Sequence, residues 1–410
     1  MGTIKQRPVV AILVGGGPAP GINSVIGAAT IRSILGGCDV IGIQDGFKWI
    51  MDGQTSKVKR LSIEDISRIH FSGGSCLGTA RANPTQKVEH LDACLTSLNA
   101  LGVTRLITIG GDDTAFSALK LEQRAAGRLQ VVHVPKTIDN DLDLPHGIPT
   151  FGFQTARHIG VELVKSLMVD AETTSRWYFV VTMGRKAGHL ALGIGKAAGA
   201  TLTVIPEEFR QKPLRLKTLV DVLAGAFIKR LNAGRSDGVA VLAEGLVEIL
   251  DQQDLDGLQD VEINFGFVLK RAVEKELRSF GIKTTIVEKN IGYELRCADP
   301  ISFDMEYTRD LGYCAAQFLL EGGNAAMVSI QNGRFIPIPF GDILDPATGR
   351  TRVRMVDVES ESYVIARRYM IRLAPDDFNQ PQALVRLATT AGLAADDFRK
   401  RFEYLMGKDL

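Results

Sequence analysis

The chain has 410 residues, of which 45% are hydrophobic and 23% are charged. This length exceeds what one ordinary hydrophobic core supports, so two lobes are expected. Because 48 Lys and Arg stand against 47 Asp and Glu, the net charge of +1 gives no reason to expect a general nucleic-acid or membrane surface, and any bound anion must be held locally.

Cysteine spacing and hydropathy indicate the compartment. The five cysteines are scattered and lack CxxC spacing, which argues against a disulfide framework or a zinc site. Glycines or charges interrupt every apolar run well short of a membrane span, and the first residues, MGTIKQRP, lack a signal-peptide core. A cytoplasmic location is therefore expected.

Short β-rich runs recur along the chain, and most end at glycine or polar residues. In chain order they are VVAILVGGG, RLITIGGDD, LQVVHVPKTIDND, YFVVTMGR, TLTVIPEE, GVAVLAEG, KTTIVEKNIGYELR and AMVSIQNG. Continuous apolar runs are typical of strands covered on both faces, as in parallel sheets. Between them, VEHLDACLTSLNALG places Val88, Leu91, Leu95 and Leu98 on one helical stripe, and NFGFVLKRAVEKELRSFG repeats the pattern up to Gly281.

Alternating strands and helices predict an α/β fold with mostly parallel, doubly wound sheets, whose sites collect at the carboxyl ends of the strands. Proline and glycine cluster in residues 143–152, and a second irregular stretch begins near 345. We expect one lobe from residues 1–150, rejoined by about 290–345, and a second from 151–290, rejoined by 346–410.

The first glycine-rich turn is GGGPAPGIN, residues 15–23, which follows a strand and leads into a helix that begins near Asn23. Glycines let the backbone approach a phosphate closely, and the start of a helix offers unpaired N–H groups to an anion. The pattern is neither GxGxxG nor a Walker loop, so a tight strand-to-helix turn explains it equally well.

Two adjacent carboxylates end the next strand in GGDDT, residues 110–114. A carboxylate at a strand end is a natural ligand for Mg²⁺, which usually binds one or two carboxylates together with substrate phosphates. The alternative is a capped turn, in which Asp113 or Thr114 is the N-cap of the following helix.

The most specific local motif is PKTIDND, residues 135–141. Asp139, Asn140 and Asp141 follow a strand, and Lys136 lies just upstream. A carboxylate beside a cation can act as a general base toward a hydroxyl, while the lysine neutralises a phosphate. An Asx-turn without chemistry would need fewer charges.

Three further strand ends carry polar side chains. Arg185 in MGRKAGHLAL can serve an anionic substrate, whereas His189 precedes an apolar stretch and is more often structural. Glu207 in IPEE and Glu244 in LAEG could accept hydrogen bonds from sugar hydroxyls.

A last strand end, GYELRCADP, supplies Tyr293 and Arg296, and arginine matches phosphate oxygens bidentately. A glycine loop, a metal carboxylate, a base and several cations are the parts that phosphoryl transfer needs, because its catalysis is mostly positioning and charge stabilisation.

With these parts assembled, the sequence resembles the phosphofructokinase family. The matching motifs occur in the family's order over about four-fifths of the chain: GGGPAPGIN, GGSCLGTAR, GGDDT, PKTIDND, SRWYFVVTMGRKAG, LAEG, GYELR and IQNG. The resemblance implies a two-lobed α/β fold in which fructose 6-phosphate and the phosphoryl donor meet in a cleft, with donor binding in the first lobe and sugar-phosphate binding in the second.

The resemblance also implies a role for each strand-end residue. Asp139 would take the proton from the sugar's 1-hydroxyl, with Arg185 as a second catalytic group, and Asp112 and Asp141 would hold Mg²⁺. The donor phosphates would be bound by Gly16, Gly17, Arg81, Asp113 and Lys136. The sugar phosphate would be bound by Thr137, Arg176, Met183, Gly184, Arg185, Glu244, Tyr293 and Arg296. Since Arg176 matches a position that reaches into a neighbouring subunit, a homodimer or homotetramer is expected.

The donor is indicated by GGDDT and PKTIDND together. ATP-dependent members of the family have GGDG and usually a glycine before TIDND, which leaves room for an α-phosphate. Here Asp113 and Lys136 fill those positions, and Gln44 stands where many ATP enzymes have an aromatic residue. The resemblance therefore implies the pyrophosphate-dependent branch, which reversibly phosphorylates fructose 6-phosphate at its 1-hydroxyl in glycolysis and gluconeogenesis.

Some residues depart from the family's common pattern, and three other functions remain open. Pro18 replaces a common aspartate, and Gly27 stands where regulated bacterial members carry an effector-binding arginine, so classical nucleotide regulation is not expected. The alternatives are an ATP-dependent phosphofructokinase, a non-catalytic regulatory subunit and a Rossmann dehydrogenase. A regulatory subunit is expected to lose the base at Asp139, and a dehydrogenase leaves PKTIDND unexplained.

Overall fold

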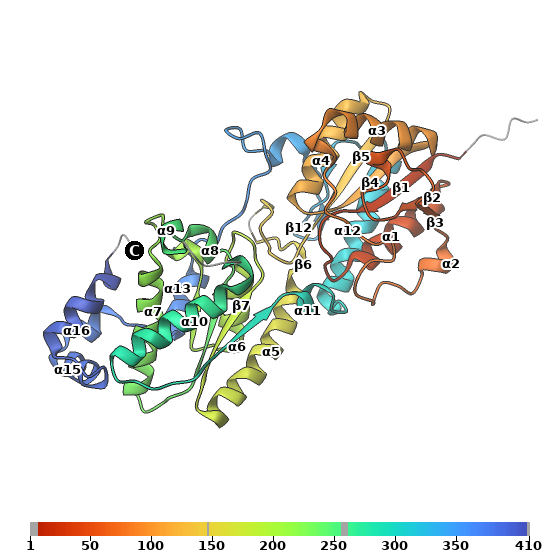
Figure 1. Cartoon of the computed structure of the whole chain (residues 1–410). Coiled ribbons are helices and arrows are strands. Elements are labelled where there is room, and N and C mark those ends of the chain that lie inside the picture. The colour runs from red at the N-terminus through yellow and green to blue at the C-terminus, as the bar shows by residue number, and fades with distance from the viewer. Residues whose placement is uncertain (1–6, 146, 256–260, 408–410) are drawn as a thin grey trace, which may run out of the picture. The chain divides into compact units, whose positions relative to one another are not determined.

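A computed structural model describes residues 7–145, 147–255 and 261–407, and its backbone contacts divide the chain into two compact units. Unit 1 comprises Met1–Ala156 and Tyr293–Arg354, and unit 2 comprises Arg157–Gly292 and Met355–Leu410. The chain passes between the units at residues 156/157, 292/293 and 354/355, where the sequence suggested 150, about 290 and 345. Each unit mixes helices with a mostly parallel sheet, so the expected α/β fold class is confirmed (Figure 1).

The sheet of unit 1 has the strand order β14-β11-β5-β4-β1-β2-β3, with β6 paired to β5. Its inner strands run parallel, whereas β14 and β3 are antiparallel edge strands. The bounds are β1 (Val9–Val14), β2 (Asp39–Ile43), β3 (Val58–Arg60), β4 (Val103–Gly110), β5 (Gln130–Thr137), β6 (Phe151–Gly152), β11 (Ala326–Met327) and β14 (Ile338–Pro339). All residues of β1 after Val9 are buried, as a continuous apolar run predicts for a strand covered on both faces.

Helices cover both faces of this sheet (Figure 1). They are α1 (Ile22–Leu35), α3 (Val88–Ala100), α4 (Asp112–Ala125) and α12 (Ser302–Leu320). The helices α3 and α4 share one apolar core with the strands, through residues such as Leu98 and Leu119. The helices α1 and α12 pack on each other so closely that a Cβ on Gly312 would lie 2.5 Å from the carbonyl oxygen of Val25.

The apolar stripe predicted for α3 is partly wrong. Leu98 is buried, and Leu91 and Leu95 pack against the core, but Val88 is 56% exposed and Cys94 takes an inward position. Helical side chains lean toward the N-terminus of their helix. The side chain of Val88, the first residue of α3, therefore points beyond the start of the helix and away from the core.

A buried carboxylate fixes the start of α5 (Phe153–Thr174) within unit 1. Asp304 in α12 accepts hydrogen bonds from the N–H of Gly152 (3.0 Å), the N–H of Thr155 (2.7 Å) and the hydroxyl of Thr155 (2.6 Å). Burial raises the pKa of Asp304, although these donors act in the opposite direction. The unit boundary therefore follows Ala156, inside α5, and not the proline and glycine cluster of residues 143–152.

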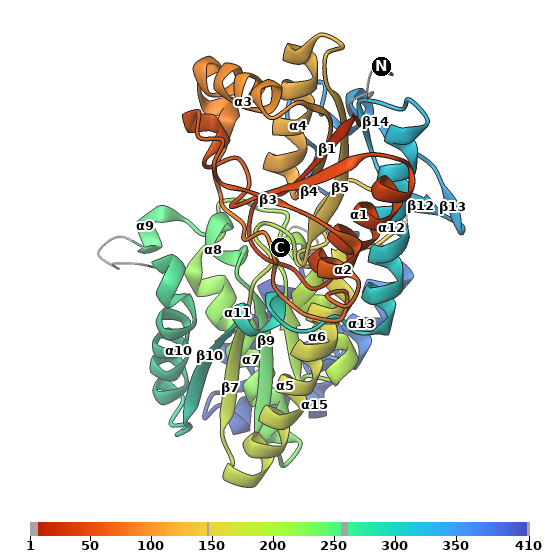
Figure 2. The same cartoon turned by 90° about the vertical axis from the view of Figure 1, so that its right-hand side faces the viewer.

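Unit 2 contains a fully parallel sheet of order β10-β7-β9-β8. The strands are β7 (Trp177–Thr182), β8 (Leu202–Val204), β9 (Gly238–Ala243) and β10 (Ile286–Ile291). One face packs against α7 (Leu216–Asn232) and α10 (Val261–Ser279), and the other packs against α6 (His189–Ala198), which touches α5 where Gly160 meets Ile194 (Figure 2). Gly281 has φ of +72° just beyond α10, as expected for a residue that ends a helix.

The C-terminal segment adds helices to the core of unit 2, where Leu387 and Phe402 join the residues of α7 and α10. These helices are α13 (Glu361–Tyr369), α14 (Pro375–Asn379), α15 (Pro381–Thr390) and α16 (Ala395–Phe402). The remaining short α-helices and strands are α2 (Ile63–Ile66), α8 (Leu246–Ile249), α9 (Gln252–Leu255), α11 (Tyr293–Arg296), β12 (Ile330–Gln331) and β13 (Arg334–Phe335).

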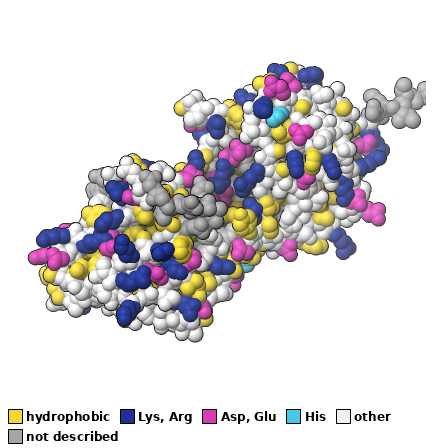
Figure 3. Space-filling view, in the orientation of Figure 1, with side chains coloured by type: hydrophobic (Ala, Val, Ile, Leu, Met, Phe, Trp, Pro, Cys, Tyr) yellow, Lys and Arg dark blue, Asp and Glu magenta, His cyan; other side chains and the backbone are white. Residues whose placement is uncertain are grey.

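Basic and acidic side chains are interspersed over the face seen in Figure 3, in keeping with the near-zero net charge. In the part of the chain that the structure describes, no helix combines the length and the apolar character that crossing a membrane requires. All five cysteines are free thiols.

Candidate active site

The glycine loop (Gly15–Gly17) follows β1 and has neighbours on two sides. Gly16 has φ of +80°, its N–H donates to the carbonyl of Ala80 (2.9 Å), and its own carbonyl accepts from the hydroxyl of Thr79 (2.6 Å). A Cβ on Gly15 would lie 2.4 Å from Oγ1 of Thr114. The loop thus needs glycine, and the exposed Arg81 lies beside it because it follows Ala80 directly.

The two carboxylates of GGDDT lie in the first turn of α4, which begins at Asp112. The N-cap is Gly111, so the alternative in which Asp113 or Thr114 caps this helix is wrong. Carboxylates in a first turn are favoured by the helix dipole and by unpaired backbone N–H groups, which explains the helical start. Asp112 is partly buried, whereas Asp113 is exposed.

Lys136, near the end of β5, is buried and reaches the glycine loop. Its side chain is only 4% exposed, and Nζ donates to the carbonyl of Gly17 over 2.5 Å. Burial lowers the pKa of Lys136 to about 8. The charged groups that act on this ammonium are Asp139, Arg296, Asp141 and Asp112. Of these, the three carboxylates favour the charged form, and the guanidinium opposes it.

The acidic loop (residues 137–141) carries two buried carboxylates, Asp139 and Asp141, which are 9% and 6% exposed. The hydroxyl of Thr137 accepts the N–H of Asp139 (3.0 Å), so this side chain fixes the backbone at the predicted base. Asn140 has φ of +58°, and its side-chain oxygen accepts the N–H of Thr150 (3.0 Å). An asparagine tolerates this left-handed conformation better than most residues.

Sequence reasoning missed Arg354, which holds the acidic loop from outside. Its backbone N–H donates to the carbonyl of Asp141 (2.8 Å), and its guanidinium donates to the carbonyl and side-chain oxygens of Asn140 (3.1 and 2.5 Å) and to the carbonyl of Ile148 (2.8 Å). The only sequence signal is an arginine in the irregular stretch RTRVRMVDVES, which cannot be linked to Asn140 without the fold.

His133 is a second residue that sequence reasoning missed. It is fully buried in β5, where Nε2 lies 3.0 Å from the carbonyl oxygen of Gly110 and Nδ1 lies 2.9 Å from the hydroxyl of Thr108. Since a carbonyl can only accept, Nε2 carries the proton and Nδ1 accepts from Thr108. Burial lowers the pKa of His133 to about 3, so the ring stays neutral and fixes the strand end that leads to Asp112.

Arg296 also lies against the glycine loop. Its Nη1 would be 3.0 Å from a Cβ on Gly17, and its guanidinium carbon lies 4.6 Å from the ring centre of Tyr293. Nε of Arg296 is buried and has no hydrogen-bond partner among the described residues. Tyr293 is 70% exposed. Unit 1 therefore brings two cations, Lys136 and Arg296, to one loop.

In unit 2 the arginine loop (residues 183–185) follows β7. Glu244, which follows β9, accepts the N–H of Gly184 (3.0 Å) and the N–H of Arg185 (2.6 Å) through Oε1. Arg185 has φ of +51°, and Met183 packs on Gly292. Glu244 thus holds this loop in a conformation that an arginine rarely adopts by itself.

Of the two other predicted strand-end residues, Glu207 has structural partners and His189 begins a helix. Glu207 accepts the N–H of Gly188 (2.8 Å) and the N–H of Val356 (3.0 Å), and burial raises its pKa. His189 is the first residue of α6. Glu207 therefore joins the turn before α6 to the segment that re-enters unit 2.

Arg176 does not lie with the arginine loop of its own unit. It immediately precedes β7, and the loop follows that strand, so six strand residues separate them. At about 3.3 Å per residue, this places Arg176 on the order of 20 Å from residues 183–185. Its Nε lies 4.0 Å from Oδ2 of Asp170, and its side chain is 36% exposed.

The predicted site residues are thus divided between the two units. Unit 1 holds Gly16, Gly17, Arg81, Asp112, Asp113, Lys136, Thr137, Asp139, Asp141, Tyr293 and Arg296, and unit 2 holds Arg176, Met183, Gly184, Arg185 and Glu244.

The residues of unit 1 fit a magnesium ion. Asp112 and Asp141 both lie close enough to Lys136 to influence the charge of its ammonium. Among the described residues, no group of three or more His, Cys, Asp and Glu side chains is arranged to hold a metal. Mg²⁺ usually takes one or two carboxylates and completes its shell with water and substrate phosphates, so two carboxylates are enough ligands from the chain.

This arrangement combines the elements of phosphoryl-group chemistry. The glycine loop lets a phosphate come close to its backbone. Beside it lie the buried ammonium of Lys136 and the guanidinium of Arg296, and such cations stabilise anionic oxygens. Next to them lie carboxylates that can hold a metal or accept a proton. Such a set suits charge stabilisation and in-line positioning of a phosphoryl group.

Comparisons with known proteins agree with this chemistry. The family model described as phosphofructokinase matches residues 9–319. A pyrophosphate–fructose 6-phosphate 1-phosphotransferase of Thermotoga maritima is 52% identical over 409 residues, which cover 96% of this chain and 97% of the relative. The enzyme of the same name from Naegleria fowleri is 47% identical over 98% of this chain and 97% of its own length.

A solved structure, the pyrophosphate-dependent phosphofructokinase from Marinobacter aquaeolei, has the same fold. The TM-score is 0.68 at 16% identity, with 94% of this chain and 92% of that chain covered. The family model, the two relatives and this fold lead to one conclusion: the chain belongs to the phosphofructokinase family.

Proposed function

We propose that this protein catalyses the reversible, magnesium-dependent transfer of a phosphoryl group from pyrophosphate to the 1-hydroxyl of fructose 6-phosphate, giving fructose 1,6-bisphosphate and phosphate. The observation that carries this proposal is the contact of the buried Lys136 with the carbonyl of Gly17. It puts a cation where the ATP-dependent pattern has a glycine. The printed names of the two relatives support the same reaction.

Asp139 is the general base of this proposal. It takes the proton of the 1-hydroxyl as the sugar oxygen forms a bond to phosphorus, and the bridging P–O bond of pyrophosphate breaks and releases phosphate. The nearby ammonium of Lys136 favours the ionised carboxylate that this step needs. Thr137 supports it because its hydroxyl fixes the backbone of Asp139.

The donor phosphates bind at the glycine loop. Gly16 and Gly17 let the donor phosphates come close to the backbone, and Lys136 supplies a positive charge. The exposed Arg81 supplies a second positive charge on the solvent side of the loop. Asp113 adds bulk and negative charge where an α-phosphate of ATP would lie, which disfavours the nucleotide.

Asp112 and Asp141 would hold Mg²⁺ together with the donor. When bound, the ion neutralises charge on the phosphate oxygens. The contribution of the chain is to keep these carboxylates in place, Asp112 through the first turn of α4 and Asp141 through its carbonyl bond to Arg354.

Sugar-phosphate binding is assigned to residues of both units. Thr137, Tyr293 and Arg296 belong to unit 1, and Met183, Gly184, Arg185 and Glu244 belong to unit 2. Oε1 of Glu244 already holds the arginine loop, so its other oxygen is the one proposed to meet a sugar hydroxyl. Arg185 is proposed to stabilise the charge that develops on the transferred group.

Arg176 is proposed to serve the site of a neighbouring subunit. Arg176 and the arginine loop of its own unit lie at opposite ends of β7, which supports this proposal. Arg176 cannot contact that loop while it stays at the start of the strand. The active form is accordingly a homodimer or a homotetramer, in the cytoplasm, where reduced cysteines are stable.

Product analysis tests the reaction. Phosphorus NMR of fructose 6-phosphate, pyrophosphate and Mg²⁺ with the enzyme should show fructose 1,6-bisphosphate and phosphate in equal amounts, and the reverse mixture should regenerate pyrophosphate. Phosphate release without bisphosphate, or no pyrophosphate in the reverse direction, would contradict the proposal. The Asp139→Ala protein is the matched control.

A further inference from the structure

A pocket in unit 2 is lined by no residue that is assigned to catalysis. It encloses a cavity of about 270 Å³ between the turn after β8, the segment around α13 and the chain end that follows α16. It is lined by Glu208, Phe209, Arg210, Val222, Val358, Glu359, Tyr363, Arg367, Arg372, Leu373, Leu405, Met406 and Gly407.

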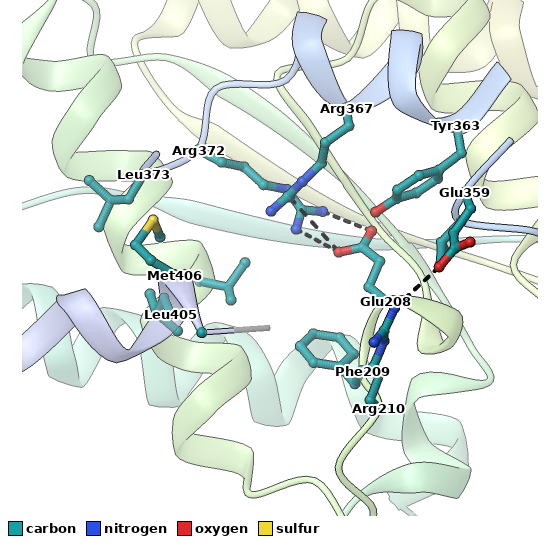
Figure 4. A pocket seen from close by; sticks show the side chains of 13 residues that line it. Glu208, Phe209, Arg210, Glu359, Tyr363, Arg367, Arg372, Leu373, Leu405 and Met406 are labelled. Atoms are coloured by element: carbon teal, nitrogen blue, oxygen red, sulfur yellow. Dashed lines mark hydrogen bonds and ion pairs between the residues drawn. The ribbon is translucent and has the colours of Figure 1, made fainter. Parts of the chain in front are cut away.

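The polar wall of the pocket is built on a buried ion pair (Figure 4). Arg372 and Glu208 are 8% and 7% exposed, and they form two hydrogen bonds of 2.6 and 3.0 Å. Arg372 also donates to the carbonyl of Thr203. Glu208 carries one negative charge, so its bidentate pairing with Arg372 compensates the charge of only one of the two arginines beside it.

The ion pair of Arg372 with Glu208 does not compensate the positive charge of Arg367. Its Nη1 lies 4.0 Å from Glu208, at the outer limit of an ion pair, and its side chain remains 40% exposed. Burial and the neighbouring charge of Arg372 lower the pKa of Arg367, which reflects incomplete compensation of its charge. Figure 4 shows the side chain of Arg367 descending from α13 toward this ion pair. The polar wall therefore carries a surplus positive charge.

A second cation lies at the rim. Arg210 lies 3.4 Å from Glu359, but these side chains are 65% and 80% exposed. An exposed pair of this kind contributes little and exchanges readily with solvent. Arg210 can therefore turn toward an anion without a large loss.

The opposite wall is apolar. Phe209 and Leu373 are 3% and 5% exposed, and Val222, Leu405 and Met406 pack against the same core. In Figure 4 Leu373, Leu405 and Met406 lie across the pocket from Tyr363 and Glu359. An inorganic anion would use only the cationic wall and leave the apolar wall in contact with water.

We propose that this pocket binds a small organic anion whose carboxylate pairs with Arg367 and whose apolar body lies against Phe209, Leu373 and Leu405. A single carboxylate matches the single surplus charge, and an aromatic or short aliphatic body matches the apolar wall. The site is independent of the phosphoryl-transfer reaction, because no residue assigned to that reaction lines it.

Isothermal titration calorimetry with phenylacetate tests this proposal on the full-length enzyme. An affinity on the order of millimolar is expected for a ligand of this size. Two further probes test the cationic and the apolar wall separately: 2-phenylethanol has the aromatic ring but no charge, and acetate has the carboxylate but no aromatic ring. Both should bind at least roughly tenfold more weakly than phenylacetate, because each of them interacts with only one of the two walls.

Variants of α13 locate the binding. Arg367→Met should weaken phenylacetate binding by roughly ten- to a hundredfold, the effect of one charged hydrogen-bonded contact, and Arg367→Lys should restore part of it. Arg368→Met, the neighbour that does not line the pocket, is the matched control and should bind as the wild type does. Thermal unfolding of each variant confirms that it is folded.

Competition separates this pocket from the active site. Saturating fructose 6-phosphate with phosphate and Mg²⁺ should leave phenylacetate binding unchanged. Displacement by these substrates, equal affinity of Arg367→Met and wild type, or no heat with phenylacetate at any soluble concentration would each overturn the proposal. None of these results depends on which phosphoryl donor the enzyme uses.

Discussion

Arg354 holds Asn140 in a left-handed conformation by two hydrogen bonds from one guanidinium. Nε donates to the carbonyl of Asn140 (3.1 Å) and Nη2 to its side-chain oxygen (2.5 Å), while φ of Asn140 is +58°. Asn140 lies between the proposed base Asp139 and the proposed metal ligand Asp141. We therefore expect the direction of both carboxylates to depend on an arginine that follows 214 positions later in the chain.

Replacing Arg354 with Ala should lower kcat roughly ten- to a hundredfold, since a misplacement of about 1 Å can cost this much. The fold should persist, because the neighbouring β-bridge between Leu142 and Val353 is made by the backbone. Steady-state kinetics beside thermal unfolding measure this. Arg350→Ala, an exposed arginine of the same stretch, is the control. Unchanged kcat in a folded Arg354→Ala protein would show that the acidic loop holds its shape unaided.

Asp139→Ala should lower kcat by roughly a hundredfold or more, the usual range for losing a general base, with a smaller change in KM. Asp139→Asn keeps the size and should be nearly as slow, because an amide cannot take the proton. Initial rates in both directions provide the measurement. Near-normal turnover of either variant would remove Asp139 from its role.

The buried Lys136 should give donor binding a pH dependence. Its pKa of about 8 lies below the ordinary value of 10.5, so the ammonium is present below pH 8 and is lost as the pH rises through 8. The specificity constant for pyrophosphate should therefore fall above pH 8, since this constant reports the free enzyme. The Lys136→Met protein has no ammonium at this position, so its pH profile reports only the other ionisations, including those of pyrophosphate. This profile is the reference for the wild-type profile. Parallel profiles of the two proteins would contradict the assignment.

Subunit exchange tests the role of Arg176. When Arg176→Ala and Asp139→Ala proteins are mixed under conditions of proven exchange, half of the sites in each hybrid dimer combine an intact Asp139 with an intact Arg176. About a quarter of wild-type activity should return, if random pairing makes half of the dimers hybrid. No recovery despite exchange would mean that Arg176 serves its own chain or only the fold.

The sequence predicts the strands of this fold well because their apolar runs depend only on burial of both faces. It also finds the strand-end carboxylates, since parallel strands bring their carboxyl ends to one edge. It fails where a distant residue decides the local structure. The N-cap of α4 is Gly111 because the first turn itself accommodates Asp112 and Asp113. Contacts such as Arg354 with Asn140 cannot be read from spacing.

The donor preference should respond to the two residues that distinguish this chain from the ATP-dependent pattern. Asp113→Gly removes charge and bulk, and Lys136→Gly removes the buried cation at the glycine loop. The double variant should shift the ratio of specificity constants toward ATP, although Gln44 offers no aromatic surface to adenine and total activity should stay low. Gln123→Gly with Lys120→Gly, two changes elsewhere on α4, tests whether loosening the helix alone has this effect.

The most direct measurement is the specificity constant of the unmodified enzyme for pyrophosphate and for ATP, at saturating fructose 6-phosphate and Mg²⁺. We expect efficient use of pyrophosphate in both directions and a specificity constant for ATP that is lower by at least roughly a hundredfold, the discrimination that a misplaced charge in a binding site can supply. Comparable or preferred use of ATP would contradict the role given to Asp113 and Lys136.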